Sequence, residues 1–239
     1  MSSDLSAETT PAKDAKWCFS WLASDPTASG TKRAALVRNS KWIDGTNITV
    51  SFLDGSEAVK NRVKQIAGKW TTPATANLTL VFMDNTNETD IRISFLFTGS
   101  WSTIGTSCKS VTDTSKPTMN FGWLDEDTPD EEAERVVLHE FGHALGLIHE
   151  HQNPAGGINW NREQVIKDLS GPPNNWSEAT IEHNMFEPYK KNETNFTALD
   201  FQSIMLYPIP AKWTTDGFSV GMNNNLSATD KTFIHQQYP

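Results

Sequence analysis

The stretch HEFGHALGLIHEHQNP, residues 139–154, contains four of the six histidines of this 239-residue chain. The residues before it predict an α-helix that continues through His139 and His143. Because these two histidines are four residues apart, their side chains project from one face of the helix, one turn apart. Imidazole rings at this spacing can share a metal ion, with about 2.0–2.1 Å between a zinc ion and each nitrogen. The stretch therefore predicts a metal site on the helix.

The ends of this helix are marked by residues with known terminal preferences. Thr128 is a favourable N-cap, Pro129 suits the first helical position, and Asp130 places a carboxylate near the positive end of the helix. Gly146 readily adopts the left-handed conformation that ends helices. We expect the helix to run to about Leu145.

The third metal ligand must come from the chain beyond the helix. His149 follows His143 by six residues, and a continued helix would turn it roughly 120° away from the ligand face. A break at Gly146 removes this obstacle. If the chain after Gly146 is extended, His149 and His151 point to the same side but lie roughly 6.6 Å apart, so only one of them can reach the metal. The spacing alone leaves both residues as candidates.

Glu140 follows the first histidine directly and points about 100° away from the ligand direction. This direction suits a general base that acts on a metal-bound water better than it suits a fourth ligand. The sequence contains no competing nucleophile signature such as Gly-X-Ser-X-Gly. Histidines and a glutamate in this pattern therefore indicate hydrolysis by an activated water.

The same residues resemble a known family. HEFGHALGLIH (139–149) resembles the HExxHxxGxxH motif of the metzincin zinc peptidases. This resemblance implies that one catalytic Zn²⁺ is bound, that His149 is its third ligand and that His151 lies outside the coordination shell. SIMLYP (203–208) resembles the methionine-containing turn that lies under the zinc in this family. By the same resemblance, Met205 packs beneath the metal rather than binding it.

Two further residues are similar to residues of the astacin branch. Tyr207 resembles the extra tyrosine ligand of the astacins and serralysins, which implies a ligand or oxyanion-binding role. Glu150 is similar to the residue that marks astacins, where it is tied to the buried mature N-terminus. The residues after Glu150 depart from the usual astacin pattern, and two cysteines allow one disulfide where an astacin domain typically has two. We interpret the chain as an astacin-like protein of a microbial or fungal branch.

The rest of the chain predicts an α+β fold. Alternating apolar and polar residues predict strands at 46–54, 77–84, 90–97 and 117–124. Helical spacing predicts further helices at 56–70, 161–169 and 177–186, and a last helix from Ser227. By resemblance, this is a metzincin-like zincin fold, with a twisted mixed sheet and the active-site helix in an upper lobe and an irregular, mainly helical lower lobe. The Ser100–Thr106 region resembles the edge strand to which an extended substrate adds.

The chain divides into a short first segment and one domain. Residues 1–40 are mostly polar and rich in Pro, Ser and Thr, so we predict an N-terminal extension or a propeptide-like segment there. Residues 41–239 are predicted to form the metzincin catalytic domain. The first residues lack a basic region followed by an apolar stretch, so we expect no secretory signal in them. The resemblance alone suggests an extracellular protein, and the localisation stays open.

Composition narrows the range of partners. With 37% hydrophobic residues the chain can bury one globular core. Its net charge of −9 and the absence of a long Lys/Arg run disfavour nucleic acid and anionic membranes as partners. No stretch reaches the roughly 18–20 apolar residues that a membrane span requires. We expect protein or peptide substrates, no nucleic acid or membrane partner, and a monomer.

The two cysteines allow three arrangements. We predict a disulfide between Cys18 and Cys108, since the chain contains an even pair. As an alternative, Cys18 lies over the cleft as a thiolate that blocks the zinc until the N-terminal segment is removed, as a cysteine-bearing propeptide does in some relatives. In the third arrangement both residues are free thiols.

The predicted function is that of a zinc-dependent endopeptidase, with His139, His143 and His149 as metal ligands. Glu140 is the predicted general base, and Tyr207 is predicted to bind the oxyanion. The alternative function is a catalytically inactive, zinc-containing module that binds peptides. Structural zinc usually has four protein ligands, whereas three histidines leave one position for water. The pattern therefore favours the enzyme, and zinc content without cleavage of casein or gelatin would favour the module.

Overall fold

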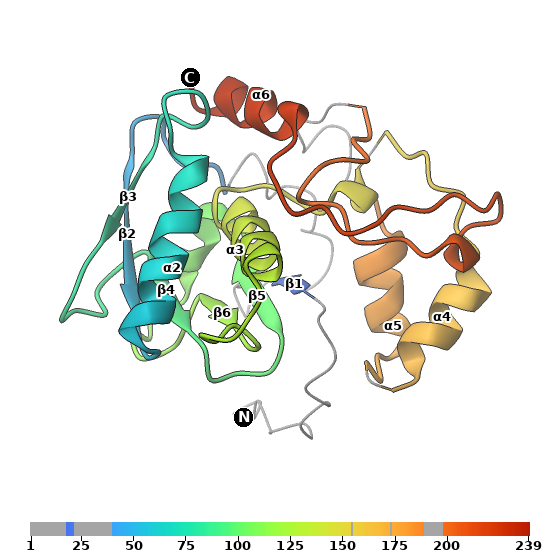
Figure 1. Cartoon of the computed structure of the whole chain (residues 1–239), viewed down its shortest axis with the longest axis horizontal. Helices are drawn as coiled ribbons and strands as arrows, with labels where there is room; N and C mark the ends of the chain where they lie inside the picture. Colours follow the sequence, from blue (N-terminus) through green and yellow to red (C-terminus); the bar gives the residue numbers. More distant parts are fainter. Residues whose placement is uncertain (1–17, 22–39, 154, 173, 189–197) are drawn as a thin grey trace.

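The computed structural model describes residues 18–21, 40–153, 155–172, 174–188 and 198–239, and its first half is built on a six-stranded sheet (Figure 1). The strand order is β1-β5-β6-β4-β2-β3. Neighbouring strands are parallel except β5 and β6, which are antiparallel. The strands are β1 (Cys18–Trp21), β2 (Asn47–Phe52), β3 (Thr79–Phe82), β4 (Ile91–Ser94), β5 (Ser100–Thr103) and β6 (Met119–Phe121). The predicted mixed sheet is confirmed.

Two helices pack together in front of the sheet in Figure 1, α2 (Glu57–Ala67) and α3 (Asp130–Ala144). A 3₁₀ turn, Gly68–Trp70, continues α2. The fully buried indole of Trp70 donates a hydrogen bond from Nε1 to the carbonyl oxygen of Leu138, 2.9 Å away. This bond reaches α3 one residue before His139, so α2 and its turn help to place the helix that carries the predicted metal ligands.

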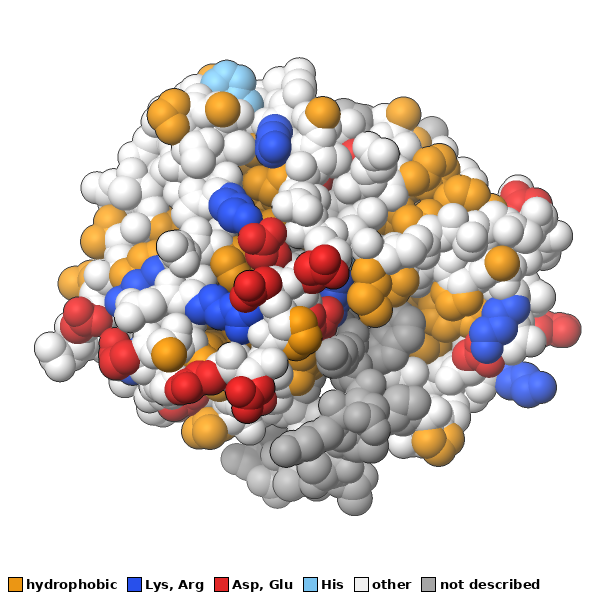
Figure 2. All heavy atoms as spheres, viewed as in Figure 1, with side chains coloured by type: hydrophobic (Ala, Val, Ile, Leu, Met, Phe, Trp, Pro, Cys, Tyr) orange, Lys and Arg blue, Asp and Glu red, His pale blue; other side chains and the backbone are white. Residues whose placement is uncertain are grey.

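Charged side chains of both signs meet on the surface over α2 and α3 (Figure 2). Arg62 pairs with Asp130 at 2.5 Å, and Lys69 pairs with Glu134 at 2.6 Å. Exposed ion pairs of this kind contribute only about 0.2–1 kcal/mol each. The buried apolar contacts beneath them, rather than the ion pairs, therefore hold the two helices together.

The second half of the chain is less regular. It contains α4 (Arg162–Ser170) and α5 (Glu178–Ile181), which lie away from the sheet (Figure 1), and α6 (Ala228–Gln237), which returns to it. This half also has 3₁₀ turns at Glu150–Gln152 and Ala211–Trp213 and a π-helical turn at Glu182–Phe186, and a further 3₁₀ turn, Gly105–Ser110, lies between β5 and β6. Among the described residues, no helix combines the length and the apolar character needed to cross a membrane. The predicted irregular, helical lower lobe agrees with this arrangement.

Several element ends differ from the sequence-based prediction, and side-chain hydrogen bonds mark two of them. Thr128 is not the N-cap of α3, because its hydroxyl bonds the carboxylate and the backbone of Asp125, at 2.7 and 3.0 Å, and Pro129 takes the N-cap position. The strand predicted at 90–97 ends at Ser94, whose hydroxyl donates to Asp54 Oδ2 at 2.6 Å. At Thr128 the side-chain hydrogen bonds accompany a helix that begins one residue later than expected, and at Ser94 they accompany a strand that ends earlier.

Cys108 is a free thiol buried in the Gly105–Ser110 turn, so the predicted disulfide with Cys18 is wrong. Only 1% of its surface is exposed. Burial, together with the nearby Asp90 carboxylate, raises the pKa of the Cys108 thiol to about 12. The side chain of Cys18 lies outside the described residues, so a zinc-blocking thiolate and a free thiol both remain open for it.

Cys108 is expected to resist modification in the folded protein, because the thiolate is the reactive form. In a Cys18→Ser variant, whose only thiol is Cys108, a disulfide reagent such as DTNB should react slowly before unfolding and with one equivalent after it. The released chromophore measures both. Fast labelling of the folded variant, or a gain in mass when the wild-type protein is reduced, would contradict the buried free thiol.

Candidate metal centre

The chain leaves α3 at a sharp break that directs it back toward the helix. Gly146 has a φ of 102°, in the left-handed region that glycine adopts without strain. The last carbonyl groups of the helix, which have no partner within it, are bound by side chains from distant segments. Trp42 Nε1 donates to Ala144 O at 2.8 Å, and the Tyr238 hydroxyl donates to Leu145 O at 2.7 Å. The predicted helix end is therefore correct, and it is fixed from two sides.

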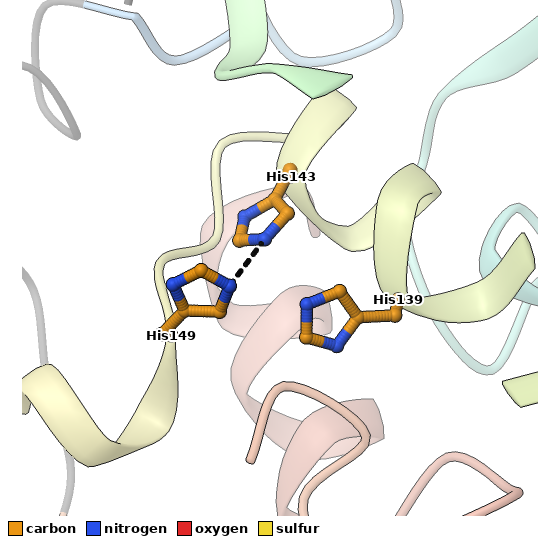
Figure 3. A group of neighbouring side chains, drawn as sticks. All are labelled: His139, His143 and His149. Atoms are coloured by element: carbon orange, nitrogen blue, oxygen red, sulfur yellow. Dashed lines mark hydrogen bonds between the residues drawn. The ribbon is translucent and has the colours of Figure 1, made fainter. Parts of the chain in front are cut away.

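Three histidine side chains meet beside this break (Figure 3). His139 and His143 project from α3, and His149 reaches them from the segment that follows. Each offers one ring nitrogen, and these three atoms lie within 4.8 Å of one another. His143 Nε2 and His149 Nε2 are 3.1 Å apart. The side chains are buried, with 2% or less of each exposed. The break at Gly146 thus brings together the three residues that the motif predicted.

The protonation of two of these rings is set by backbone carbonyls. His139 Nδ1 lies 2.8 Å from Ile204 O, and His143 Nδ1 lies 2.9 Å from Leu147 O. A carbonyl oxygen only accepts, so each Nδ1 carries the proton and each Nε2 keeps its lone pair. His139 Nε2 is buried and has no hydrogen-bond partner in the described part of the chain. Bonds of this kind to the second ring nitrogen orient metal-ligating histidines.

Burial keeps these imidazoles neutral. It lowers the pKa of His143 to about 4, and it lowers the pKa of His139 and His149 well below the usual 6.5. Repulsion between the neighbouring histidines adds to the effect at His139 and His149. Neutral imidazole is the form that binds metal. Three such nitrogens match the donor set of a catalytic zinc site, which keeps a fourth position open. The residues present therefore fit a zinc ion.

The two predicted catalytic residues lie at the same place. Glu140 is fully buried on α3, next to His139. The ring of Tyr207 packs against His149 with 4.4 Å between centroids and lies nearly parallel to His139 at 5.8 Å. Only 3% of Tyr207 is exposed. The structure thus brings together all five predicted site residues, although Tyr207 lies 58 residues beyond His149 in the sequence.

Met205 packs against α3 at Gly142, one residue before the ligand His143. A Cβ atom added to Gly142 would lie 2.3 Å from Met205 Sδ, so the methionine fills the space that the glycine leaves. The backbone of the same turn contacts both ligand segments, because Ile204 O faces His139 and Met205 O accepts from Glu150 N at 2.9 Å. The sequence analysis missed Ile204, since a backbone carbonyl leaves no mark in the side-chain pattern.

His151, the second candidate for the third ligand, has another partner. Its Nε2 lies 2.7 Å from Asn184 O, in the π-helical turn of the lower lobe. Its ring stacks on His149 and Tyr207, with centroids 5.1 and 4.7 Å away. It does not belong to the group of three converging nitrogens. The geometry favours His149 as the third ligand, and His151 links the site to the lower lobe.

Glu150 is largely buried between the two candidates. Its Oε1 accepts hydrogen bonds from Asp200 N at 2.9 Å and from Asn153 Nδ2 at 3.0 Å. Burial is the main reason that the pKa of Glu150 rises to about 7. Glu150 thus connects two segments: Asn153, which follows the third histidine, and Asp200, which precedes the Met205 turn.

The edge of β5, to which a substrate was expected to add, is paired with another strand, β1. β1 pairs with β5 in parallel, with Cys18 opposite Ser100 and Trp21 opposite Thr103. On its other side β5 is paired with β6. The Ser100–Thr103 backbone is therefore hydrogen-bonded on both sides, and a peptide can join it only where β1 is absent.

Two solved structures of myroilysin are similar to this chain. One is 45% identical, with a TM-score of 0.82, and the match covers 85% of this chain and 98% of that chain. The other is 41% identical, with a TM-score of 0.68 and coverage of 95% and 93%. This chain belongs to the myroilysin family. Neither a family model nor a curated protein matches the chain.

Myroilysin is a metallopeptidase, and its structures agree with the fold expected here. The match does not bear on the astacin-like assignment, which stays a prediction.

Zinc uptake is expected to persist to lower pH than at a site of exposed histidines. The pKa of His143 is about 4 rather than 6.5, so its imidazole stays neutral, and protons compete with the metal only as the pH approaches 4. Zinc per chain after equilibrium dialysis, measured by atomic absorption from neutral pH downward, tests this. Loss of half of the zinc near pH 6.5, with circular dichroism still showing a folded protein, would contradict it.

Proposed function

We propose that this protein is a zinc-dependent endopeptidase that hydrolyses peptide bonds of protein substrates. The observation that carries the proposal is the convergence of three buried, neutral imidazole groups beside Glu140 and Tyr207. The similarity to myroilysin, a metallopeptidase, supports it. His139, His143 and His149 would hold the metal through Nε2 atoms. When bound, zinc lowers the pKa of its water towards neutrality and polarises the scissile carbonyl.

Glu140 is the proposed general base. Its carboxylate accepts the proton that the attacking water loses, and then passes this proton to the nitrogen of the leaving amine. The carboxylate is fully buried and lies on the same helix as two of the ligands. A rigid helix and the absence of bulk water fix its position relative to the reacting groups.

Tyr207 is the proposed oxyanion-binding residue. Its hydroxyl donates a hydrogen bond to the former carbonyl oxygen of the scissile bond as negative charge develops there. Donors of this kind contribute about 2.7–4 kcal/mol in other hydrolases. The ring packs against both His149 and His151, so its position depends on both histidines.

Residues 1–40 are the proposed inhibitory extension, and residues 41–239 the proposed catalytic domain. β1 belongs to this extension and occupies the β5 edge to which an extended substrate would add. One match to myroilysin covers 95% of this chain, more than residues 41–239 alone make up. That match therefore includes part of residues 1–40.

An inactive zinc-containing module that binds peptides is the second candidate. The same β5 edge would bind its ligand, so the edge does not distinguish the two functions. Glu140 does, because a binding module has no use for a buried carboxylate next to the ligands. Zinc content without any peptide cleavage, after removal of the extension, would favour the module.

A series of variants tests the role of each site residue. Alanine at His139, His143 or His149 should remove zinc under mild dialysis, because two protein ligands hold the metal too weakly. Glu140→Gln should keep zinc and lose turnover by up to about 10⁴-fold, since it removes the base alone. Tyr207→Phe should keep zinc and lose about 10²-fold, since it removes one oxyanion donor.

His151→Ala is the matched control for this series, because His151 packs beside the ligands without joining them. It should keep zinc. Atomic absorption and hydrolysis of a fluorogenic peptide measure the two properties for every variant. Loss of zinc in His151→Ala and its retention in His149→Ala would show that the third ligand is assigned wrongly.

Deletion of residues 1–35 is expected to raise peptide hydrolysis, because it removes β1 and frees the β5 edge. The Cys18→Ser variant of the full chain separates two causes. If strand pairing alone blocks the site, this variant stays inactive, and if the Cys18 thiolate blocks the zinc, it gains activity. Equal rates for the full chain and a truncated protein with the same zinc content and melting temperature would refute the inhibitory role.

A further inference from the structure

The turn Ser203–Met205 contacts the segments of two metal ligands. Ile204 O lies 2.8 Å from His139 Nδ1, and Met205 O accepts from Glu150 N, next to His149. The three residues of the turn are at most 2% exposed. A shift of this turn would therefore move the acceptor of His139 and the backbone beside His149 together.

One carboxylate on α6 binds this turn from the other side. Asp230 Oδ1 accepts from the Ser203 hydroxyl at 2.7 Å, and Asp230 Oδ2 accepts from Ile204 N at 2.9 Å. The Ser203 oxygen in turn accepts from Met205 N at 3.0 Å. Asp230 is 6% exposed. The residue whose carbonyl binds His139 is thus held at its nitrogen by Asp230.

Asp230 also belongs to the capping box that begins α6. Its Oδ2 accepts from Ser227 N at 2.9 Å, and its own N donates to the Ser227 hydroxyl. The capping box alone does not account for the hydrogen bonds of Asp230 to Ser203 and Ile204, which lie more than 20 residues earlier in the chain. An ionised carboxylate accepts at both oxygens and donates at neither, which matches the three donors that Asp230 receives here.

We propose that Asp230 is a positioning residue of the metal centre, which fixes the Ser203–Met205 turn so that Ile204 O holds the His139 ring with Nε2 directed at the metal. The inference rests on the proposed function only in assuming that the three histidines bind zinc. Through this chain of hydrogen bonds the last helix of the protein contributes to metal affinity without touching the metal. Partners of this kind typically change metal affinity by about 10–100-fold.

The test compares Asp230→Ala with Ile234→Ala, a matched control on the same helix. Ile234 is fully buried, and its side chain takes no part in the hydrogen bonds to the turn. Both variants should lower the melting temperature of the metal-free protein. Asp230→Ala should bind zinc about 10–100-fold more weakly than the wild type in competition with a chelator of known affinity, whereas Ile234→Ala should stay close to the wild type.

A second measurement follows the ring directly in the metal-free protein. The proton on His139 Nδ1, which is hydrogen-bonded to Ile204 O, should give a slowly exchanging ¹⁵N-attached signal in the wild type and in Ile234→Ala. It should be lost or exchange faster in Asp230→Ala. A role in helix capping alone would leave this signal unchanged.

Asp230→Asn keeps the test decisive if Asp230→Ala does not fold. Its amide oxygen can still accept from Ile204 N, while its amide nitrogen faces the Ser203 oxygen, so zinc should bind more weakly than in Ile234→Ala but more tightly than in Asp230→Ala. Equal zinc affinity in the Asp230 and Ile234 variants would overturn the inference. A wild-type protein that takes up no zinc would instead overturn the proposed function, and the positioning role with it.

Discussion

The structure depends on the burial of three imidazole rings whose free nitrogens face one another. Each ring must be neutral and in one tautomer for its Nε2 to serve as a ligand, and backbone carbonyls at Ile204 and Leu147 impose this on His139 and His143. Among the described residues His139 Nε2 has no hydrogen-bond partner, and a buried polar atom without a partner is costly. The surrounding elements must therefore be rigid enough to keep the rings together, and a metal ion would give the His139 nitrogen a partner.

That rigidity comes from contacts that converge on α3 from all parts of the chain. Trp70 reaches it from the turn after α2, Trp42 and Tyr238 bind its last carbonyl groups, and Met205 fills the space beside Gly142. The lower lobe contributes through His151, which joins Asn184 to the rings of His149 and Tyr207. The site thus lies where both lobes meet the end of one helix, a common place for an active site.

Local rules predicted much of this arrangement from the sequence. The four-residue spacing of His139 and His143 fixes a shared helix face, and Gly146 predicts the break, because both follow from backbone geometry. The choice of His149 over His151 needed the family resemblance, since an extended segment offers both. The disulfide prediction was wrong because cysteine counts carry no information about the distance between residues. The contact of Asp230 with Ser203 and the pairing of β1 with β5 join residues far apart in sequence, and local patterns do not specify such contacts.

The central claim is that a histidine-bound metal and Glu140 cleave peptide bonds. Its most direct test is digestion of a peptide library by zinc-loaded protein that lacks residues 1–35, followed by mass spectrometry of the products. The account predicts internal cleavage that stops when 1,10-phenanthroline removes the metal and returns when zinc is added. Undiminished cleavage by the metal-stripped protein, or no cleavage by a fully zinc-loaded one, would contradict it.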